Sequence, residues 1–425
     1  MPKTLNDWLA HIERQHPDAI ELGLDRVRAV AQRMGLTRPA RKVVTVGGTN
    51  GKGSTVAFVE AIARAAGWRT AAYTSPHLLA YNERVRIDGR DAGDDALVAG
   101  FEAVEAARGD TALTYFEYGT LCALWLFERA RLDLAILEVG LGGRLDAVNL
   151  VDPDVAIITT VDIDHVDWLG GDREAIGREK AGIARAWTPL VLGDDDPPAS
   201  VLRHAYAIGA PAVRANCDFF FELHGDEGWR WREINRTYAL PLPRLAAPSQ
   251  LRNAATAIAA LRALGEPLPE AAIAEGVAGA QVPGRLQRVE RDGVEGLVDV
   301  AHNPQASREL ARWLQGSRTA GRTLAVFAAL GDKDLAGIVA PLASLVDAWH
   351  LAGLESVGGR GLPVAEFQRR LAGTAAAAGR AHATVEAAVA SALEAARPGD
   401  RILVFGSFHT AAAALQALAV PAGQG

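Results

Sequence analysis

Residues 43–54 read Val43-Val44-Thr45-Val46-Gly47-Gly48-Thr49-Asn50-Gly51-Lys52-Gly53-Ser54. An apolar strand runs into a glycine-rich turn with one lysine, and the pattern beyond it predicts an amphipathic helix. Glycines let backbone N–H groups close around phosphate oxygens, and a helix N-terminus adds a favourable dipole. The stretch therefore predicts a phosphate-binding loop in which Lys52 reaches the β- and γ-phosphates of a nucleotide, with Ser54 or Thr55 near Mg²⁺.

This loop departs from the standard phosphate-binding pattern at two positions. Val46 stands where the first glycine belongs, and Gly53 separates the lysine from Ser54. The alternative interpretation is a tight strand-to-helix turn that binds no ligand. Because strand, loop and helix follow in the required order, we favour phosphate binding.

Short apolar runs alternate with helical stretches on both sides of this loop. We expect strands at residues 42–46, 69–73, 134–139, 155–160 and 190–192, and helices at residues 55–66 and 120–129. Such alternation predicts an α/β domain with a mostly parallel sheet covered on both faces. The aromatic run at residues 219–231, broken by a Gly/Asp turn, predicts a small antiparallel hairpin added to that domain.

The chain is too long for one typical hydrophobic core, so two domains are expected. A Gly/Pro-bearing stretch at residues 279–284 is the candidate boundary, and strands are expected again at residues 296–300, 323–329, 348–351 and 401–405. We therefore predict a first domain at residues 1–283 and a smaller α/β domain at residues 284–425.

Charged side chains follow two of the expected strands of the first domain. Glu138 ends one apolar run, and Asp164-His165 follows another. A buried carboxylate is costly unless it is paired or binds a metal, and ligands of open α/β sheets gather at the carboxyl ends of strands. His165 alone is more often a hydrogen-bonded structural group, but beside Glu138 and the phosphate loop it becomes a candidate metal ligand.

Lys180 falls on one helical face with Ile176 and Ile183. A lysine on an apolar face either extends its ammonium group to solvent or loses its charge and is used chemically. The spacing by itself does not choose between these two interpretations.

Bulk composition excludes several classes of protein. A net charge of −7 lacks the basic footprint of nucleic-acid binding, and two widely spaced cysteines exclude a disulfide framework. No signal peptide and no apolar run of bilayer length is found. We expect a cytoplasmic monomer with small-molecule substrates and no nucleic-acid or membrane partner. Serine or cysteine hydrolysis is not supported, since neither cysteine has a plausible partner and no Gly-x-Ser-x-Gly turn occurs.

Because these motifs follow one another in a particular order along the chain, the sequence resembles the bacterial bifunctional dihydrofolate synthase/folylpolyglutamate synthase family of the Mur-ligase-like superfamily. The resemblance covers nearly the whole chain. Its motifs are residues 21–27, 48–54, 74–78, 83–86, 114–117, 137–149, 164–165, 179–183, 283–285, 299–304 and 406–409. One departure is Val148, where the family commonly has threonine.

The resemblance implies an N-terminal P-loop ATPase domain with the pterin pocket and a smaller Rossmann-like C-terminal domain that closes over ATP and glutamate. ATP and one or two Mg²⁺ ions are the implied cofactors. The implied nucleotide-binding residues are Thr49, Asn50, Gly51, Lys52, Gly53, Ser54, Asn253, Arg285 and Asp299. The implied metal ligands are Ser75, Glu138 and His165, and the implied catalytic residues are Lys52, Lys180 and His302.

Two further implications concern Lys180 and the substrate. The matching lysine of the family is carbamylated, which favours the second interpretation of Lys180. The implied pterin-pocket residues are Ala19, Ile20, Glu21, Leu22, Thr114, Tyr115, Phe116, Glu117, Leu145, Asp146 and Ala147.

The implied reaction is ATP-dependent addition of L-glutamate to 7,8-dihydropteroate and to tetrahydrofolate through an acyl phosphate. Three alternatives stay open at this point. One is a ligase with only one of the two activities, the second is a Mur-type cell-wall ligase, and the third is an ATPase switch without ligase chemistry.

Overall fold

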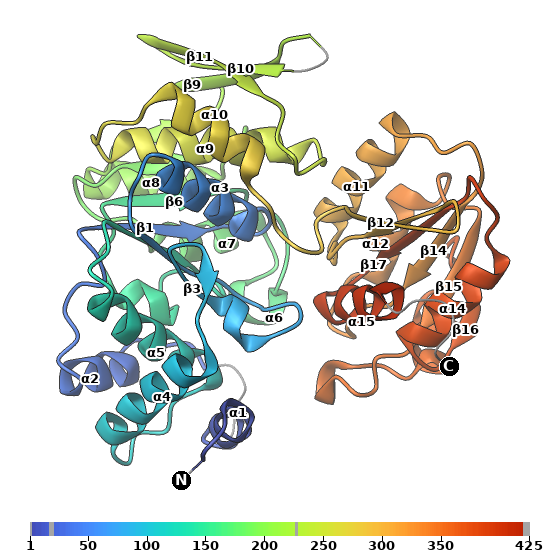
Figure 1. The fold of residues 1–425 in the computed structure, drawn as a ribbon, viewed down its shortest axis with the longest axis horizontal. Helices are drawn as coiled ribbons and strands as arrows, with labels where there is room; N and C mark the ends of the chain where they lie inside the picture. The colour runs from blue at the N-terminus through green and yellow to red at the C-terminus, as the bar shows by residue number, and fades with distance from the viewer. Residues whose placement is uncertain (1, 17–20, 226–227, 420–425) are drawn as a thin grey trace. The chain divides into compact units, whose positions relative to one another are not determined.

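The computed structural model describes residues 2–16, 21–225 and 228–419. The chain divides into two compact units (Figure 1). The first comprises Met1–Arg244 and Gln250–Gln281, and the second comprises Leu245–Ser249 and Val282–Gly425. Each unit is described by itself.

The first unit is built on an eight-stranded sheet in the order β4-β3-β2-β5-β1-β6-β7-β8. Its central strands are parallel, and β3 and β4 extend one edge in antiparallel pairing. The strands are β1 (Lys42–Gly47), β2 (Thr70–Tyr73), β3 (Val85–Ile87), β4 (Arg90–Asp91), β5 (Leu134–Glu138), β6 (Val155–Ile158), β7 (Leu190–Leu192) and β8 (Ala212–Arg214).

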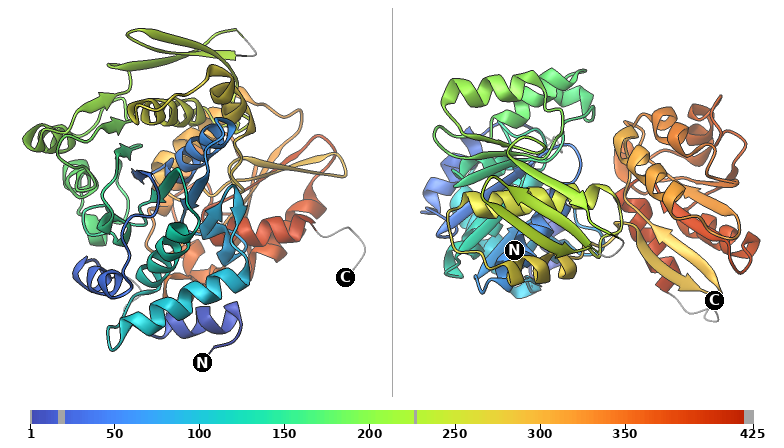
Figure 2. Two further views of the ribbon diagram at one scale, coloured as in Figure 1. Left: turned by 60° about the vertical axis from the view of Figure 1, so that its left-hand side comes forward. Right: turned by 90° about the horizontal axis from the view of Figure 1, so that it is seen from above.

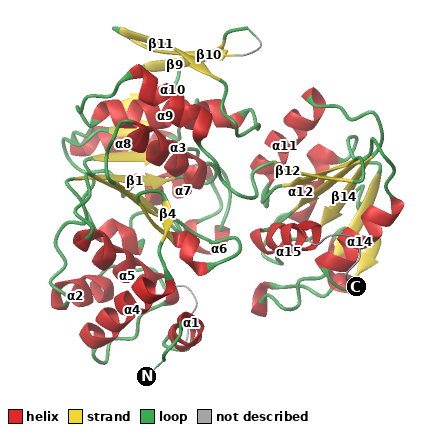
Figure 3. Ribbon diagram, in the orientation of Figure 1, coloured by secondary structure: helices red, strands yellow, loops and turns green. Residues whose placement is uncertain are grey.

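Helices surround this sheet (Figure 3). They are α1 (Leu5–Glu13), α2 (Asp25–Arg33), α3 (Lys52–Ala65), α4 (Asp94–Arg108), α5 (Tyr115–Arg129), α6 (Val166–Leu169), α7 (Arg173–Ala181), α8 (Ala199–Ile208), α9 (Ser249–Ala263) and α10 (Glu270–Gly279), with short 3-10 turns η1 (Tyr81–Arg84) and η2 (Ala147–Leu150). Gly276 of α10 permits close packing on α3, because a Cβ there would lie 2.4 Å from the Ile62 Cα.

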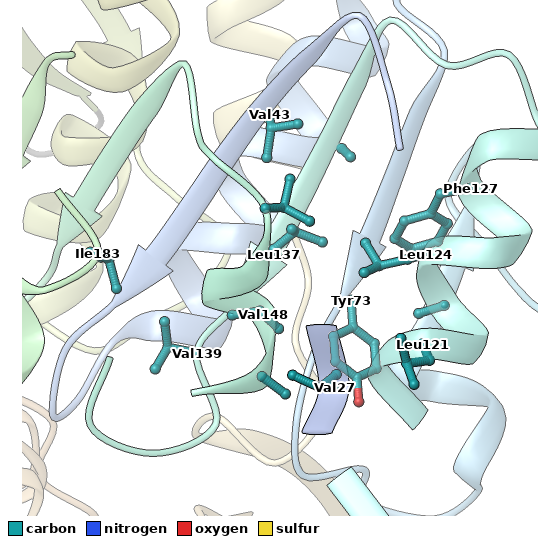
Figure 4. Close-up of a cluster of buried hydrophobic side chains, with 14 of the residues drawn as sticks. Val27, Val43, Tyr73, Leu121, Leu124, Phe127, Leu137, Val139, Val148 and Ile183 are labelled. Atoms are coloured by element: carbon teal, nitrogen blue, oxygen red, sulfur yellow. The ribbon is translucent and has the colours of Figure 1, made fainter. Parts of the chain in front are cut away.

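The packing of the core explains why the strands are apolar at successive positions and do not alternate between apolar and polar residues. Val43 and Leu137 point to the face covered by α5, where Leu124 and Phe127 pack (Figure 4). Successive strand residues point to opposite faces, so the neighbouring Val44 lies on the other face. Both Val43 and Val44 are fully buried. Such two-sided burial is typical of a parallel sheet between helical layers, as the sequence predicts.

The aromatic segment forms more than the expected hairpin. The strands β9 (Phe219–Leu223), β10 (Gly228–Glu233) and β11 (Arg236–Pro241) make a separate three-stranded antiparallel sheet. Trp231 Nε1 donates to the Ala255 carbonyl of α9 at 3.1 Å, which fixes this sheet over that helix (Figure 2). The third strand, β11, has a single aromatic residue, Tyr238, which stacks on Trp231, and the sequence analysis does not predict this strand.

The second unit is an α/β domain with a six-stranded sheet in the order β12-β13-β17-β14-β15-β16, parallel except for the β12–β13 pair. Its strands are β12 (Gln287–Arg291), β13 (Val294–Val298), β14 (Thr323–Phe327), β15 (Ala348–Ala352), β16 (Arg380–His382) and β17 (Arg401–Phe405). Its helices are α11 (Pro304–Gly316), α12 (Leu335–Val339), α13 (Val364–Arg370), α14 (Val385–Ala395) and α15 (Phe408–Ala419), with 3-10 turns η3 (Ala340–Leu342) and η4 (Gly358–Arg360).

Across both units, the helices in the described part of the chain are all too short or too polar to span a lipid bilayer.

Candidate active site

The glycine-rich loop connects β1 to α3 at the carboxyl edge of the large sheet. Gly48 and Gly51 adopt φ angles of +144° and +88°, which residues with a Cβ rarely adopt. A Cβ on Gly48 would lie 1.9 Å from Thr159 Oγ1, so the loop passes directly against the strand-end of β6. α3 begins at Lys52, and the N–H groups at the start of a helix suit an anion.

Hydrogen bonds to the segment after β6 hold this loop in shape. The Thr49 N–H donates to the Thr160 carbonyl at 2.7 Å, and the Asn50 N–H donates to Thr160 Oγ1 at 3.2 Å. Thr49 Oγ1 accepts from the Asp162 N–H at 3.1 Å and donates to the Asp162 carbonyl at 3.0 Å. The two strand-end segments therefore form one rigid structure.

Two lysines converge on this loop. Lys52 Nζ donates to the Gly48 and Thr49 carbonyls at 3.1 and 3.2 Å, and Lys180 Nζ donates to the same Gly48 carbonyl at 3.0 Å. Burial first and the Lys52 charge second lower the pKa of Lys180 to about 7, against the attraction of Asp164 and Asp146. Lys180 is 4% exposed, so its side chain does not extend to solvent as a surface lysine would.

Glu138 lies at the adjoining strand end, because β5 pairs with β1 and sets Glu138 opposite Val46. Its Oε2 accepts from the Ser75 N–H at 3.2 Å. Gly53 lies beside this carboxylate, because a Cβ there would be in ordinary contact with Glu138 Oε2 at 3.7 Å. The structure thus brings Ser75 and Glu138 together next to the first turn of α3.

His165 follows β6 and adopts a left-handed conformation, with φ +52°. Its N–H donates to Asp164 Oδ1 at 2.8 Å, and its Nε2 lies 4.0 Å from Asp164 Oδ2. Among the described residues, no group of three His, Cys, Asp or Glu side chains could by itself hold a metal ion. A hydroxyl, a carboxylate and an imidazole nevertheless fit Mg²⁺, which usually takes few protein ligands and completes its shell with waters and phosphate oxygens.

Asn253 of α9 lies against the other side of the loop. A Cβ on Gly51 would come within 2.6 Å of Asn253 Oδ1, and Asn253 Nδ2 donates to Gln250 Oε1 at 3.0 Å. This buried side chain therefore borders the residues expected to hold phosphates.

The segments expected to form the substrate pocket also come together in the first unit. Thr114 and Glu117 form a capping box at the start of α5. The Gly23 N–H donates to the Leu145 carbonyl at 3.3 Å, which joins residues 21–24 to the turn before η2. Glu21 and Leu22 belong to this arrangement, whereas Ala19 and Ile20 lie outside the described residues.

Asp146 is buried within that turn. Its Oδ2 accepts from the Leu141 N–H at 2.9 Å, and its Oδ1 accepts from the Val148 N–H at 3.1 Å. Burial raises the pKa of Asp146 to about 7, although backbone N–H donors favour the carboxylate. A carboxyl group of this kind can change protonation state near neutral pH.

The second unit carries its own cluster of candidate residues. Asp299 follows β13 and accepts from the Leu286 and Ala301 N–H groups at 2.9 and 2.8 Å. Burial raises the pKa of this carboxyl, while the Arg285 charge opposes the shift. The Arg285 guanidinium lies over the Phe408 ring, 5.8 Å from its centroid.

His302 lies near the same aromatic ring. Its ring centroid is 6.1 Å from that of Phe408, and its Nδ1 lies 2.9 Å from the Val300 carbonyl. Because a carbonyl only accepts, Nδ1 carries the proton in the neutral ring and Nε2 is the basic nitrogen. Asn303 caps α11 beside it, so this turn has a structural role as well.

Two family models match the chain. The Mur ligase middle domain matches residues 46–261, and the Mur ligase glutamate ligase domain matches residues 284–408. The dihydrofolate synthase/folylpolyglutamate synthase of Escherichia coli K12 is 45% identical over 97% of this chain and 95% of its own. That of Haemophilus influenzae is 40% identical over 96% of both chains.

The chain belongs to the dihydrofolate synthase/folylpolyglutamate synthase family. It is therefore an ATP-dependent, amide-forming ligase of the Mur-ligase type. Solved structures agree along the whole chain. E. coli FolC in complex with DHPP and ADP superposes with a TM-score of 0.92 at 46% identity, covering 97% of each chain.

A second solved structure of this family shows the ligands of its reaction. The bifunctional folylpolyglutamate synthase/dihydrofolate synthase with Mn, AMPPNP and L-glutamate bound has a TM-score of 0.91 at 45% identity, over 98% of each chain. The expected fold class is confirmed by these matches: a mostly parallel N-terminal domain followed by a second α/β domain.

The sequence analysis assigns no role to Arg84, a buried cation of this ligase. Arg84 is 9% exposed, its Nε donates to His77 Nδ1 at 2.8 Å, and its guanidinium lies 5.4 and 5.5 Å from the Tyr81 and Tyr115 ring centroids. Among the described residues, no carboxylate lies within ion-pair distance of it. The residue stands in one of the motifs that carry the family resemblance, but its burial beside Tyr115 needed the structure.

Proposed function

We propose that this protein adds L-glutamate to 7,8-dihydropteroate, forming dihydrofolate, and to tetrahydrofolate, extending its glutamate chain. The observation that carries the proposal is the pair of lysines on the Gly48 carbonyl beside Glu138, in a chain 45% identical to the E. coli bifunctional enzyme. A phosphate loop supported by a second, buried lysine suits transfer of a phosphoryl group to a carboxylate.

In the first step, a carboxylate oxygen of the pterin substrate attacks the γ-phosphorus of ATP, and ADP leaves with the bridging oxygen. In the second step, the amine of L-glutamate attacks the acyl carbon, inorganic phosphate leaves, and the amine loses a proton. Lys52 is proposed to balance the charge that develops on the transferred phosphoryl group. The binding of ATP phosphates is assigned to Thr49, Asn50, Gly51, Lys52, Gly53 and Ser54, with Asn253 beside the loop.

A divalent ion is proposed at Ser75, Glu138 and His165. The homologous structure with Mn and AMPPNP supports ATP together with a divalent metal, for which we propose one or two Mg²⁺ ions. When bound, Mg²⁺ would supply charge neutralisation at the phosphate oxygens. Glu138 suits this role because it is buried with an acceptor oxygen directed to the Ser75 N–H and the start of α3.

Lys180 is proposed to be carbamylated. A neutral amine adds to CO₂ with release of one proton, and a lysine with a pKa of about 7 is largely neutral under mildly alkaline conditions. The product is an anion, so the ammonium group of Lys52 would then face an opposite charge instead of a like charge. This change would remove the repulsion that the unmodified pair carries.

The pterin end of the substrate is assigned to residues 19–22, 114–117 and 145–147. Support comes from the Gly23–Leu145 bond, which joins residues 21–24 to the turn at 145–147, and from Arg26, which donates to both the Glu21 carbonyl and Glu117 Oε1. In the second unit, Arg285 and Asp299 are proposed to complete nucleotide binding and His302 to act as a base through Nε2. The functional division at residue 283 stays a prediction.

The location, the assembly state and the kind of substrate are proposed as well. A monomer in the cytoplasm is the expectation, and the two cysteines, the buried Cys122 and the exposed Cys217, form no disulfide. Small-molecule substrates are supported by the DHPP, ADP and L-glutamate bound to the homologues.

The test is phosphate release from ATP and Mg²⁺ with dihydropteroate and L-glutamate added separately and together. Release that requires both, with dihydrofolate identified by mass spectrometry, supports the synthase, and the same assay with tetrahydrofolate tests chain extension. Activity with tetrahydrofolate alone would restrict the protein to folylpolyglutamate synthesis. Release without either acceptor would overturn the ligase proposal in favour of an ATPase.

A further inference from the structure

Arg26 of α2 contacts two segments of the proposed substrate pocket at once. Its Nη2 donates to Glu117 Oε1 at 3.1 Å and to the Glu21 carbonyl at 3.2 Å, and its Nη1 forms an ion pair with the Glu21 carboxylate. Glu21 and Glu117 are 96 residues apart in the sequence. One guanidinium therefore fixes the distance between two chain segments that the sheet alone does not connect.

Glu117 needs this partner because it is buried. Its side chain is 4% exposed, and its Oε2 is already engaged by the Thr114 N–H at 2.8 Å. A buried carboxylate that loses its countercharge is strongly destabilising, because the charge is left uncompensated away from water. Arg26 supplies that charge, and the planar fork of a guanidinium can reach two carboxylates in a way that an ammonium group cannot.

The Glu21 carboxylate has a second partner besides Arg26. Its second oxygen, Oε2, lies 2.8 Å from His16 Nε2. Two residues further on, the Gly23 N–H binds the Leu145 carbonyl. Residues 21–24 are thus fixed to α5 through Arg26 and to the turn that contains Asp146 through Gly23.

We propose that Arg26 is a positioning residue for the pterin end of the substrate, setting the spacing of residues 21–22, 114–117 and 145–147. The inference rests on the proposed function. Removing Arg26 should let the Glu21 segment move away from the start of α5 and leave the phosphate loop unaltered. The binding of the pterin substrate should therefore weaken more than the binding of ATP or L-glutamate.

The experiment is steady-state kinetics of Arg26→Met, Arg26→Lys and the control Arg28→Met, varying dihydropteroate, ATP and L-glutamate in turn. Arg28 is exposed on the same helix. We expect the KM for dihydropteroate to rise about tenfold or more in Arg26→Met and less in Arg26→Lys, with the other two KM values within about twofold. Arg28→Met should match the wild type.

Two further outcomes separate positioning from folding. If Arg26→Met folds poorly, Arg26→Met with Glu117→Gln removes the buried charge as well. This double variant should recover folding and keep the KM for dihydropteroate above that of Glu117→Gln alone, because Glu21 is still not held. An unchanged KM for dihydropteroate, or an equal rise in all three KM values, would overturn the inference. A wild type inactive with dihydropteroate would instead overturn the proposed function itself.

Discussion

Lys52 and Lys180 donate to one acceptor, the Gly48 carbonyl oxygen, at N···O distances of 3.1 and 3.0 Å. They come from helices 128 residues apart, and both amines lie at the turn between β1 and α3. Two ammonium groups on one carbonyl repel each other, and burial penalises the charge of Lys180 further. The site therefore favours a Lys180 that is neutral, or one that has become an anion.

The lowered pKa of Lys180 makes stability dependent on pH. The folded pKa is about 7, below the ordinary lysine value, so between pH 7 and 10 the unfolded chain binds a proton that the folded chain does not. Stability contributed by this residue must rise as pH rises through that window. Lys180→Met should be more stable than the wild type at pH 7 and lose about 2–3 kcal/mol of that advantage by pH 9.

Urea denaturation at both pH values measures this difference. The partly exposed Lys42 provides the control, because Lys42→Met should keep a constant difference from the wild type. A flat difference for Lys180→Met would contradict the lowered pKa.

Carbamylation of Lys180 predicts a spectroscopic signature. Wild-type protein in ¹³C-bicarbonate at mildly alkaline pH should show a carbamate carbonyl resonance in ¹³C NMR, because the neutral amine is the form that adds CO₂. The resonance should be missing from Lys180→Met and present in Lys52→Met. Its absence from the wild type would leave Lys180 as an unmodified amine and refute the modification.

Lys52→Ala should lose about 3–5 kcal/mol of transition-state stabilisation, measured as kcat/KM for ATP-dependent amide formation. The physical reason is the loss of the Lys52 ammonium group, which lies beside the Gly48 and Thr49 carbonyls. Lys42→Ala, at the opposite end of β1, should stay within about twofold of the wild type. Near-normal turnover in Lys52→Ala would remove this residue from the mechanism.

Alanine substitutions at the two glycines that flank Lys52 should change the stability of the protein by clearly different amounts. Gly51 has a φ of +88°, and its new Cβ would approach Asn253 Oδ1 to 2.6 Å, so Gly51→Ala should cost about 1–3 kcal/mol. Gly53 lies in α3, where a Cβ meets its nearest neighbour at 3.7 Å, so Gly53→Ala should be neutral or slightly stabilising. Thermal unfolding checks both, and equal effects would contradict this loop conformation.

In the second unit, Arg401→Met should destabilise by about 2–4 kcal/mol. Arg401 is 3% exposed, donates to Glu295 Oε2 and the Ser317 carbonyl at 2.7 Å each, and lies 5.1 Å from the Trp313 ring centroid. The loss removes one of the two arginine partners of Glu295, which also contacts Arg288, and the donor to the Ser317 carbonyl. Denaturation monitored by circular dichroism measures the change in the free energy of unfolding. The exposed Arg312→Met is the control, and we expect it within about 0.5 kcal/mol of the wild type.

The sequence by itself determined the order of strand, loop and helix around Lys52 and the parallel sheet that follows from alternating apolar runs. These features depend on local periodicity and on glycine positions, which are readable along the chain. The sequence also indicated Glu138 and His165 as candidate site residues, because both follow apolar strands whose carboxyl ends must meet at one edge of the sheet.

Only the tertiary structure decided the burial of Lys180 and the contacts of Arg26 and Arg84. Spacing alone did not choose between a Lys180 that extends to solvent and one that loses its charge and is used chemically, and its burial against Gly48 excludes the first. Arg26 donates to Glu117, 91 residues further along the chain, and β11 completes its small sheet with only one aromatic residue, Tyr238. Burial, ion pairing and pKa depend on which distant segments surround a group, and a linear pattern carries no such distances.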